Sequence, residues 1–167
     1  MTRPIFSTSR PPSRERHLSL KRLKKGEEFV VRICSKQIFG YHSHWFKGHS
    51  HPCYTEQCEC PAPLSEARRE WHGVIHAFAC VQQKDGFLEL TDRCCEMLLD
   101  QVPNPDNLRG VRVTFRRSKG GDNGRLTCQV DQFAAIDRDL PSEQDPRKTL
   151  DVIWASKTPV DLLAFTG

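Results

Sequence analysis

Apolar and polar residues alternate in several short segments of the chain, which is the pattern of half-buried β-strands. Phe29, Val31 and Ile33 fall on one side of the first segment, and that strand can continue to Tyr41 if it bends at Gly40. The segments with this pattern are Phe29–Cys34, Trp71–Val81, Phe87–Leu90, Leu108–Arg117 and Arg125–Val130. We therefore expect the chain to fold mainly as β-sheet.

Helical periodicity is strongest in one short stretch. Thr91 offers an N-cap, apolar residues follow it at helical spacing, and Pro103 ends the run. A further helical turn is expected around Thr149–Trp154. Between the predicted strands, Lys84–Asp85–Gly86 and residues 118–124 have the composition of turns, so two hairpins are expected.

Neither period survives between His42 and Arg69, where His, Cys, Pro and Gly dominate. A loop of this length is uncommon and needs an internal organiser. Thiolates and imidazoles are the usual ligands of structural zinc, and a bound metal can order such a segment. The composition of the loop therefore predicts a metal site.

We predict a structural Cys3His zinc site made of Cys53, Cys58, Cys60 and His44, with His49 as the alternative histidine. His44 is favoured because it follows the first strand and can fix the start of the loop to its end. The C-x4-C-x-C spacing differs from the usual C-x2-C, so exposed residues of a flexible loop are the alternative interpretation. The other cysteines are expected to be small buried apolar residues: Cys34, Cys80, Cys94, Cys95 and Cys128.

The predicted elements follow the order strand, long loop, strand, strand, helix, strand, strand. Over about residues 26–131 this order resembles the OB-fold family. The resemblance implies a five-stranded OB-like Greek-key barrel, with one short helix between strands 3 and 4 and a zinc-ordered loop between strands 1 and 2. It also implies an oligonucleotide cleft on strands 2 and 3, flanked by the His/Cys loop and the 118–124 hairpin.

Charge divides the chain into three parts. The net charge of +4 is the sum of +7 over residues 1–25 (eight basic, one acidic), 0 over 26–130 (thirteen of each) and −3 over 131–167 (four basic, seven acidic). We interpret these as a disordered basic arm (1–25), an OB-like domain (26–133) with a zinc insertion at 42–70, and an acidic C-terminal tail (134–167). No apolar run suggests a membrane span or a secretory signal, so a soluble, cytoplasmic protein is expected.

Basic residues concentrate in the last predicted hairpin, where residues 109–125 hold six basic side chains and one acid. A positive stripe with nearby aromatic rings is typical of proteins that bind single-stranded nucleic acid. The alternatives are a solvated face for the charges and core packing for Trp71, which we favour for that residue. The predicted nucleic-acid-binding residues are Arg32, Lys36, Trp45, Phe46, Trp71, His72, Arg112, Arg116, Arg117, Lys119 and Arg125.

The leading hypothesis is a non-enzymatic protein that binds single-stranded DNA or RNA. A protein-interaction module of the same fold is the second, since the tail, with Asp161–Phe165 at its end, is loosely similar to the partner-recruiting tails of bacterial single-stranded-DNA-binding proteins. A zinc-dependent nuclease or hydrolase is the third, because histidines remain beyond the metal site: His42, His49, His51, His72 and His76. His72 and His76 share one face of a predicted strand, where we favour exposed polar residues of the binding face over a latent active site. No nucleophile elbow, phosphate-binding loop or H-E-x-x-H motif supports an enzyme.

Overall fold

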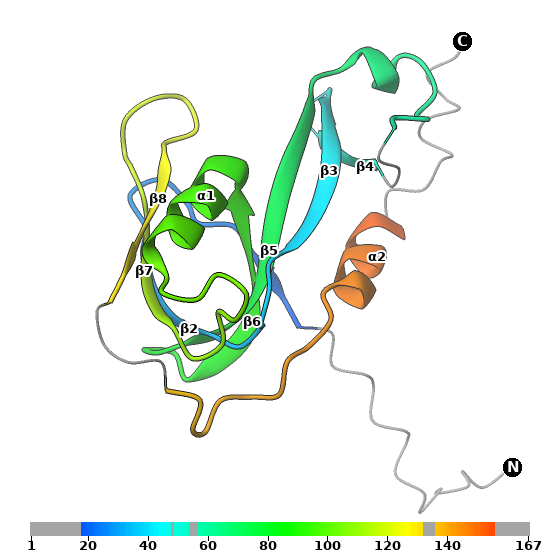
Figure 1. The fold of residues 1–167 in the computed structure, drawn as a ribbon. Helices are drawn as coiled ribbons and strands as arrows, with labels where there is room; N and C mark the ends of the chain where they lie inside the picture. The colour runs from blue at the N-terminus through cyan, green and yellow to red at the C-terminus, as the bar shows by residue number, and fades with distance from the viewer. Residues whose placement is uncertain (1–17, 48, 54–56, 132–135, 156–167) are drawn as a thin grey trace, which may run out of the picture.

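The computed structural model describes residues 18–47, 49–53, 57–131 and 136–155. Within them the chain is mainly β, with two α-helices, one 3-10 helix and a mixed sheet of eight strands (Figure 1). The strands are β1 (Leu20–Lys21), β2 (Glu28–Ile33), β3 (Phe39–Phe46), β4 (His49–Cys53), β5 (Arg69–Ala79), β6 (Lys84–Thr91), β7 (Arg112–Arg117) and β8 (Leu126–Val130). The helices are η1 (Leu64–Glu66), α1 (Asp92–Gln101) and α2 (Arg147–Ala155).

The sheet runs in the order β1-β6-β5-β2-β7-β8, and β3 adds to it by pairing with β5 and β4. All pairs are antiparallel except β1 with β6. The long strand β5 pairs with β2, β3 and β6, so it connects the packed part of the molecule to the hairpin of β3 and β4 (Figure 1). Among the described residues β8 pairs with β7 alone, so the sheet is not closed, and the five-stranded barrel stays a prediction.

The first predicted strand is two strands. The chain leaves the strand conformation after Ile33 and resumes it at Phe39, so the bend lies at residues 34–38 and the expected bend at Gly40 is wrong. Gly40 has a different use, because the ring of Trp71 lies directly against its Cα and leaves no room for a side chain.

The expectation of an irregular segment from His42 to Arg69 is wrong for its first part. Strands β3 and β4 form an antiparallel hairpin there, in register His42↔Cys53 and His44↔His51. The alternation of apolar and polar residues is missing because the inward-facing side chains of this hairpin are histidine and cysteine. A core strand would have apolar side chains at these positions. A search for hydrophobic periodicity does not find such strands.

The turn of the second hairpin lies earlier than predicted, at residues 80–83, where Gln83 has a positive φ of 53° and its N–H donates to the carbonyl of Ala79. The predicted turn residues pair instead with the end of β5. Gly86 lies at a close approach of two chain segments, since a Cβ at this position would lie 3.2 Å from the carbonyl oxygen of Ser19. The strand predicted from Leu108 also begins later, at Arg112, because Gly110 adopts a φ of 86°.

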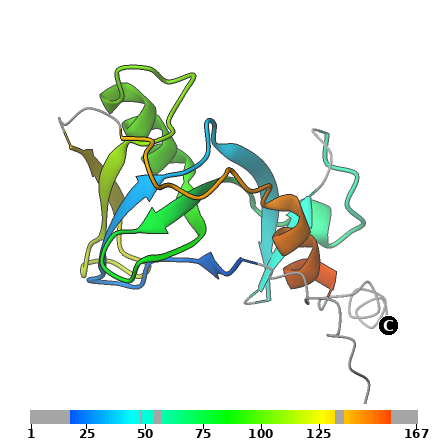
Figure 2. The same cartoon turned by 90° about the horizontal axis from the view of Figure 1, so that it is seen from below.

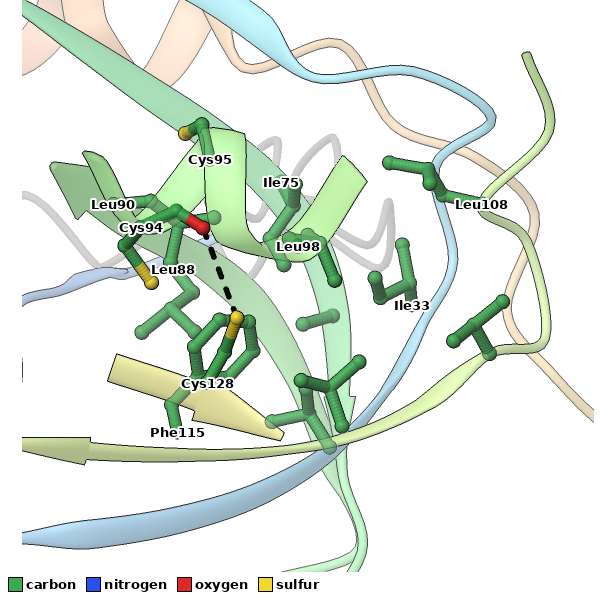
Figure 3. Close-up of a cluster of buried hydrophobic side chains, with 14 of the residues drawn as sticks. Ile33, Ile75, Leu88, Leu90, Cys94, Cys95, Leu98, Leu108, Phe115 and Cys128 are labelled. Atoms are coloured by element: carbon green, nitrogen blue, oxygen red, sulfur yellow. Dashed lines mark hydrogen bonds between the residues drawn. The ribbon is translucent and has the colours of Figure 1, made fainter. Parts of the chain in front are cut away.

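The core lies between α1 and the strands (Figure 3). Helix α1 begins as predicted: Thr91 Oγ1 accepts a hydrogen bond from the N–H of Cys94 at 3.3 Å. Phe115 and Leu98 are fully buried, and the thiol of Cys128 donates to the carbonyl of Cys94 at 3.7 Å. Four of the five cysteines expected in the core are buried, and the other, Cys80, is half-buried.

Both ends of the described chain pack on the sheet. Residues 18–25, which we assigned to a disordered arm, include β1 and the core residue Leu23, while residues 1–17 lie outside the described part. Arg109 fixes the C-terminal segment (residues 136–155) by donating to Asp137 Oδ1 at 2.5 Å and to the carbonyl oxygen of Pro141 at 2.9 Å. This segment crosses the β2–β3 connection on its way to α2 (Figure 2). The predicted helical turn near the C-terminus is confirmed as α2.

The C-terminal segment covers the face of β5 that points away from the core. Ile75 and Ala77 belong to the core cluster, so His76 between them points to the other face. There the N–H of Gln144 donates to His76 Nδ1 at 3.2 Å, and Leu150 is only 2% exposed. Neither helix of the described chain is long and apolar enough to cross a membrane.

Candidate metal centre

Four side chains from one polar segment of the sequence meet beside the β3–β4 hairpin: His44, Cys53, Cys58 and Cys60. One ligand atom from each lies within 4.8 Å of all the others. His44 is 1% and Cys53 4% exposed, while the other two cysteines are half-buried. We call these residues the metal-ligand cluster.

The hairpin register explains how two of these residues meet. His44 pairs with His51, so Cys53, two residues further along β4, projects from the same face as a diagonal neighbour. The other two ligands come from the segment after β4, which returns past the hairpin toward β5. The start of the predicted loop is thereby held against its end.

A hydrogen bond to the backbone orients the imidazole of His44. Its Nδ1 lies 3.0 Å from the carbonyl oxygen of Ala67 and donates its proton there, which leaves the lone pair of Nε2 facing the cluster. Nε2 lies 3.1 Å from the sulfur of Cys58. Histidine ligands of metals usually have such a partner on the second nitrogen, because it fixes the tautomer and the ring.

A single turn of 3-10 helix positions that carbonyl. Ala67 ends η1 with an N–H bond to the carbonyl of Leu64 at 3.0 Å, and Leu64 is itself buried, 3% exposed. We did not predict this turn. The prolines Pro61 and Pro63 signal irregular backbone, but nothing in the sequence connects Ala67 to His44.

The thiols of the cluster influence one another. Hydrogen bonds from the backbone of Cys60, and then from the side chains of Cys60, His44 and Cys53, lower the pKa of the Cys58 thiol to about 7. Burial, together with the neighbouring thiols, raises the pKa of Cys60 to about 12. One thiol therefore ionises near neutral pH, and the next keeps its proton unless a cation compensates the added charge.

The cluster could hold a metal ion. In a tetrahedral site with metal–ligand bonds of about 2.0–2.3 Å, ligand atoms lie about 3.5–3.8 Å apart. The spacing in the cluster is compatible with closure around an ion after small side-chain shifts. The four predicted ligands are thus brought together. The side chain of His49, the alternative ligand, lies outside the described residues.

The two aromatic residues predicted in the loop have different environments. Trp45, next to His44 on β3, is 56% exposed. Phe46 is half-buried. The centroid of its ring lies 6.4 Å from the ring centroid of His51 and 5.5 Å from the ammonium nitrogen of Lys47. Trp71 packs against the core cluster, which is the interpretation that we favoured for it.

The predicted basic stripe lies on the outer face of β7, because Val113 and Phe115 point into the core. Its charges are partly compensated. Arg112 lies 3.2 Å from Asp131, and Arg116 lies 2.5 Å from Glu28. Arg32, opposite Arg112 on β2, donates to the carbonyl of Gly110 at 3.0 Å.

The other predicted contacts are scattered. Arg117 donates to the carbonyl oxygens of Asn123 and Gly124, so it supports the hairpin turn. Besides Trp45 and Arg116, the exposed members of the predicted set are Lys36, Lys119 and Arg125. The predicted binding residues therefore come from several elements, namely β2, β3, β5, β7 and the segments after β2 and β7.

His72 belongs to a buried polar network. Its Nδ1 lies 3.4 Å from Glu89, which also accepts hydrogen bonds from Arg22 and the Tyr41 hydroxyl at 2.7 and 2.9 Å. Burial lowers the pKa of His72, and the nearby Glu89 carboxylate offsets this only in part. Burial, and then the same carboxylate, raises the pKa of Tyr41.

No protein-family model matches the chain, and the searches of curated proteins and of solved structures found no significant match.

Proposed function

We propose that this is a non-enzymatic protein that binds single-stranded DNA or RNA, with an OB-like barrel and a β3–β4 hairpin ordered by structural zinc. One observation carries the proposal: Trp45 is 56% exposed on a strand whose adjacent residue, His44, is a member of the metal-ligand cluster. More than half of this large apolar side chain is therefore available to a ligand. Such rings provide stacking surfaces for bases, worth about 1–3 kcal/mol each.

Zinc is the metal that best suits the donor set. Three thiolates and one imidazole form a common structural zinc site, and soft sulfur ligands disfavour magnesium and calcium. Four protein ligands complete a tetrahedron, which leaves no position for a reacting water. In this proposal the metal orders the hairpin and takes no part in a reaction.

The strand pairings support the OB-like barrel. Strand β2 lies between β5 and β7, β6 follows β5, β8 follows β7, and α1 lies between β6 and β7 in sequence. A partly open five-stranded Greek-key barrel has this kind of path. In such a barrel, the β3–β4 hairpin and the turn at residues 118–125 correspond to the two loops that flank the cleft of OB folds.

Binding of a fluorescent single-stranded oligonucleotide at two salt concentrations tests the proposal. We expect affinity to fall as salt rises, because basic side chains displace counterions from phosphates. Trp45→Ala should weaken binding about 5- to 150-fold, which corresponds to the loss of one stacked base, whereas Trp45→Phe should retain most of it. Val81→Ala, at an apolar residue that is 79% exposed, is the matched control. Absence of binding at low salt would refute the proposal.

The second candidate is a protein-interaction module, which the same exposed tryptophan favours, because tryptophan is enriched at the energetic centres of protein interfaces. This candidate predicts that Trp45→Ala abolishes capture of a protein partner, and that neither the wild-type protein nor the variant binds the oligonucleotide. The proposed recruiting segment at Asp161–Phe165 lies outside the described residues.

The enzyme hypothesis has weaker support. His76 lines a cavity of about 370 Å³ together with Ser35, beneath the C-terminal segment. Both ring nitrogens of His76 are engaged, Nε2 with Asp85 at 2.9 Å and Nδ1 with the N–H of Gln144. An imidazole in this state has no free nitrogen to take a proton from Ser35 or from water.

A further inference from the structure

A groove of about 550 Å³ lies between the start of α1 and the turn that joins β7 to β8. Three of the residues that line it are charged: Arg93 and Arg125 on the basic side, and Asp122 at the tip of the turn. The remaining lining residues are Thr91, Gly120, Gly121, Asn123, Gly124 and Leu126. Arg93 was not among the residues predicted from the sequence, because it follows an N-cap on a helix and belongs to no run of basic residues.

The two arginines of the groove are unpaired in the part of the chain that the structure describes. Within the described residues, neither guanidinium makes an ion pair or a hydrogen bond, and both side chains are exposed. Arg112 and Arg116 of the stripe, by contrast, face Asp131 and Glu28. An arginine that already pairs with a carboxylate gains less from a phosphate, because the existing pair must first be broken.

Further positive charge gathers at the turn. The ammonium of Lys25 donates to the carbonyl of Gly121, and the side chain of Lys119 lies against Gly26. The nearby acid of the turn is Asp122. The local charge is therefore positive, although the segment from residue 26 to 130 is neutral as a whole.

The backbone leaves the groove accessible. A Cβ at Gly120 or Gly121 would meet nothing within 4 Å, so the space beside these two residues is open, although the carbonyl of Gly121 already accepts from Lys25. Gly124 has the opposite role: its φ of 65° and the close approach of the Ser118 carbonyl require glycine. The turn is held by hydrogen bonds from Arg117 and from the N–H of Arg125 to Ser118 Oγ, the latter 2.7 Å long.

The outer face of β5 is not available in the same way, because the C-terminal segment covers it. His76 is 1% exposed there, and Leu150 is buried. An incoming strand would have to displace the contacts of Arg109 and Gln144 described above.

We infer that the groove between α1 and the β7–β8 turn binds the phosphodiester backbone of a single nucleic-acid strand, with Arg93 and Arg125 as the phosphate contacts, in place of the paired arginines of the β7 stripe. The inference rests on the proposed function and specifies where phosphates bind. Charge complementarity and the accessible main chain favour a flexible phosphodiester chain as the occupant.

The test compares two double variants of the full-length protein, Arg93→Gln/Arg125→Gln in the groove and Arg112→Gln/Arg116→Gln in the stripe. Both remove two positive charges, so net charge is matched. For single strands each lost phosphate contact lowers the slope of log K against log salt by about 0.7, so the groove variant should lose about 1.4 and the stripe variant much less. Asp122→Asn should strengthen binding at low salt.

The outcomes separate the two proposals. If the wild-type protein binds and the groove variant keeps its full salt slope, the groove assignment is wrong while the proposed function stands. An equal loss in both double variants also overturns the assignment, since it reflects net charge alone. If polyglutamate competes as well as the oligonucleotide, the groove binds acidic polypeptides and the inference fails. Absence of wild-type binding refutes both proposals.

Discussion

The packed strands and the β3–β4 hairpin belong to one sheet, yet different forces hold them. Strands β2, β5, β6 and β7 place fully buried side chains such as Ile75 and Phe115 against α1. The β3–β4 hairpin has polar side chains on its inner face, and β4 pairs with β3 alone in the described chain. Strand β3 is also paired with β5, so β4 is the edge strand of this part of the sheet, and a short edge strand without an apolar face has little packing to stabilise it.

This comparison shows that continuity of a sheet does not imply a common source of stability. Burial of apolar area stabilises the core at any metal concentration. We propose that the hairpin depends instead on a metal ion held by the four ligand atoms, which lie within 4.8 Å of one another, with His44 fixed by the carbonyl of Ala67. The two parts meet at β5, where Gly40 and Trp71 pack together.

Removal of the metal should have the largest effect, and it should be confined to the hairpin. Structural zinc contributes on the order of 10 kcal/mol to the folding of the segment that it orders. Cys58→Ser, or a chelator, should abolish zinc binding and the hydrogen-exchange protection of β4, while protection of β2 and β7 persists. Elemental analysis and exchange mass spectrometry provide the measurements.

Cys80→Ser is the matched control for that experiment, because Cys80 lies outside the metal-ligand cluster and is half-buried. It should retain one equivalent of zinc. A wild-type protein that keeps all its protection after chelation would show that the hairpin is stable without a metal.

A cavity in the core should destabilise the packed strands and leave zinc binding intact. Phe115 is 0% exposed, and Phe115→Ala should lower the free energy of unfolding by about 3–5 kcal/mol. The folded variant should still bind one zinc. Thr114→Ala, whose side chain points to the outer face, should change stability by no more than about 0.5 kcal/mol. Loss of zinc from the folded Phe115 variant would mean that core and hairpin form one cooperative unit.

Gly40→Ala tests the junction between the two regions. The added methyl must displace the ring of Trp71, which packs against the core, so the cost should be about 1–3 kcal/mol. Gly120→Ala, with nothing within 4 Å of its Cβ, is the control and should be nearly neutral. Denaturant unfolding measures both. Equal stability of the two variants would show that Trp71 moves freely and that the regions are only weakly coupled.

The smallest effect concerns the pH dependence of the same junction. The pKa of His72 is lowered in the folded protein, so below a pH of about 6.5 the unfolded chain binds more protons than the folded one. The free energy of unfolding should therefore fall as pH decreases from 7.5 to 6, by at most about 1.4 kcal/mol per pH unit for one group.

His72→Gln should remove this component. The difference between wild-type and variant unfolding curves, measured across that range, isolates it from protonation of the metal ligands, which both proteins share. A difference that does not change with pH would mean that the folded environment does not perturb His72.

Much of the core was predictable because its residues follow simple periods. Alternation identified the core-facing positions of β7, and Thr91 with Pro103 gave the limits of α1 to within a few residues. The turn of the second hairpin was misplaced because Gly86, a residue typical of turns, occupies a strand position that Ser19 approaches closely. Turn composition alone cannot distinguish these two uses of glycine.

The metal-ligand cluster was predictable in composition, since three cysteines and a histidine close together in one polar segment match the donor set of structural zinc. The supporting parts were not: the β3–β4 hairpin lacks hydrophobic periodicity, and Ala67 is linked to His44 only through space. Arg93 was missed for a similar reason, because it joins Arg125 across a turn and a helix start.

By itself the sequence determined the mainly β character, the position of α1 and the three cysteine ligands with a histidine as the fourth, because each depends on local periodicity or on donor chemistry. Only the tertiary structure decided which arginines are paired, which face of β5 is covered, and which groove stays accessible. Those properties depend on contacts such as Arg116 with Glu28 or His76 with Gln144, between residues separated by tens of positions. Such contacts exist only after the sheet has set the register of its strands.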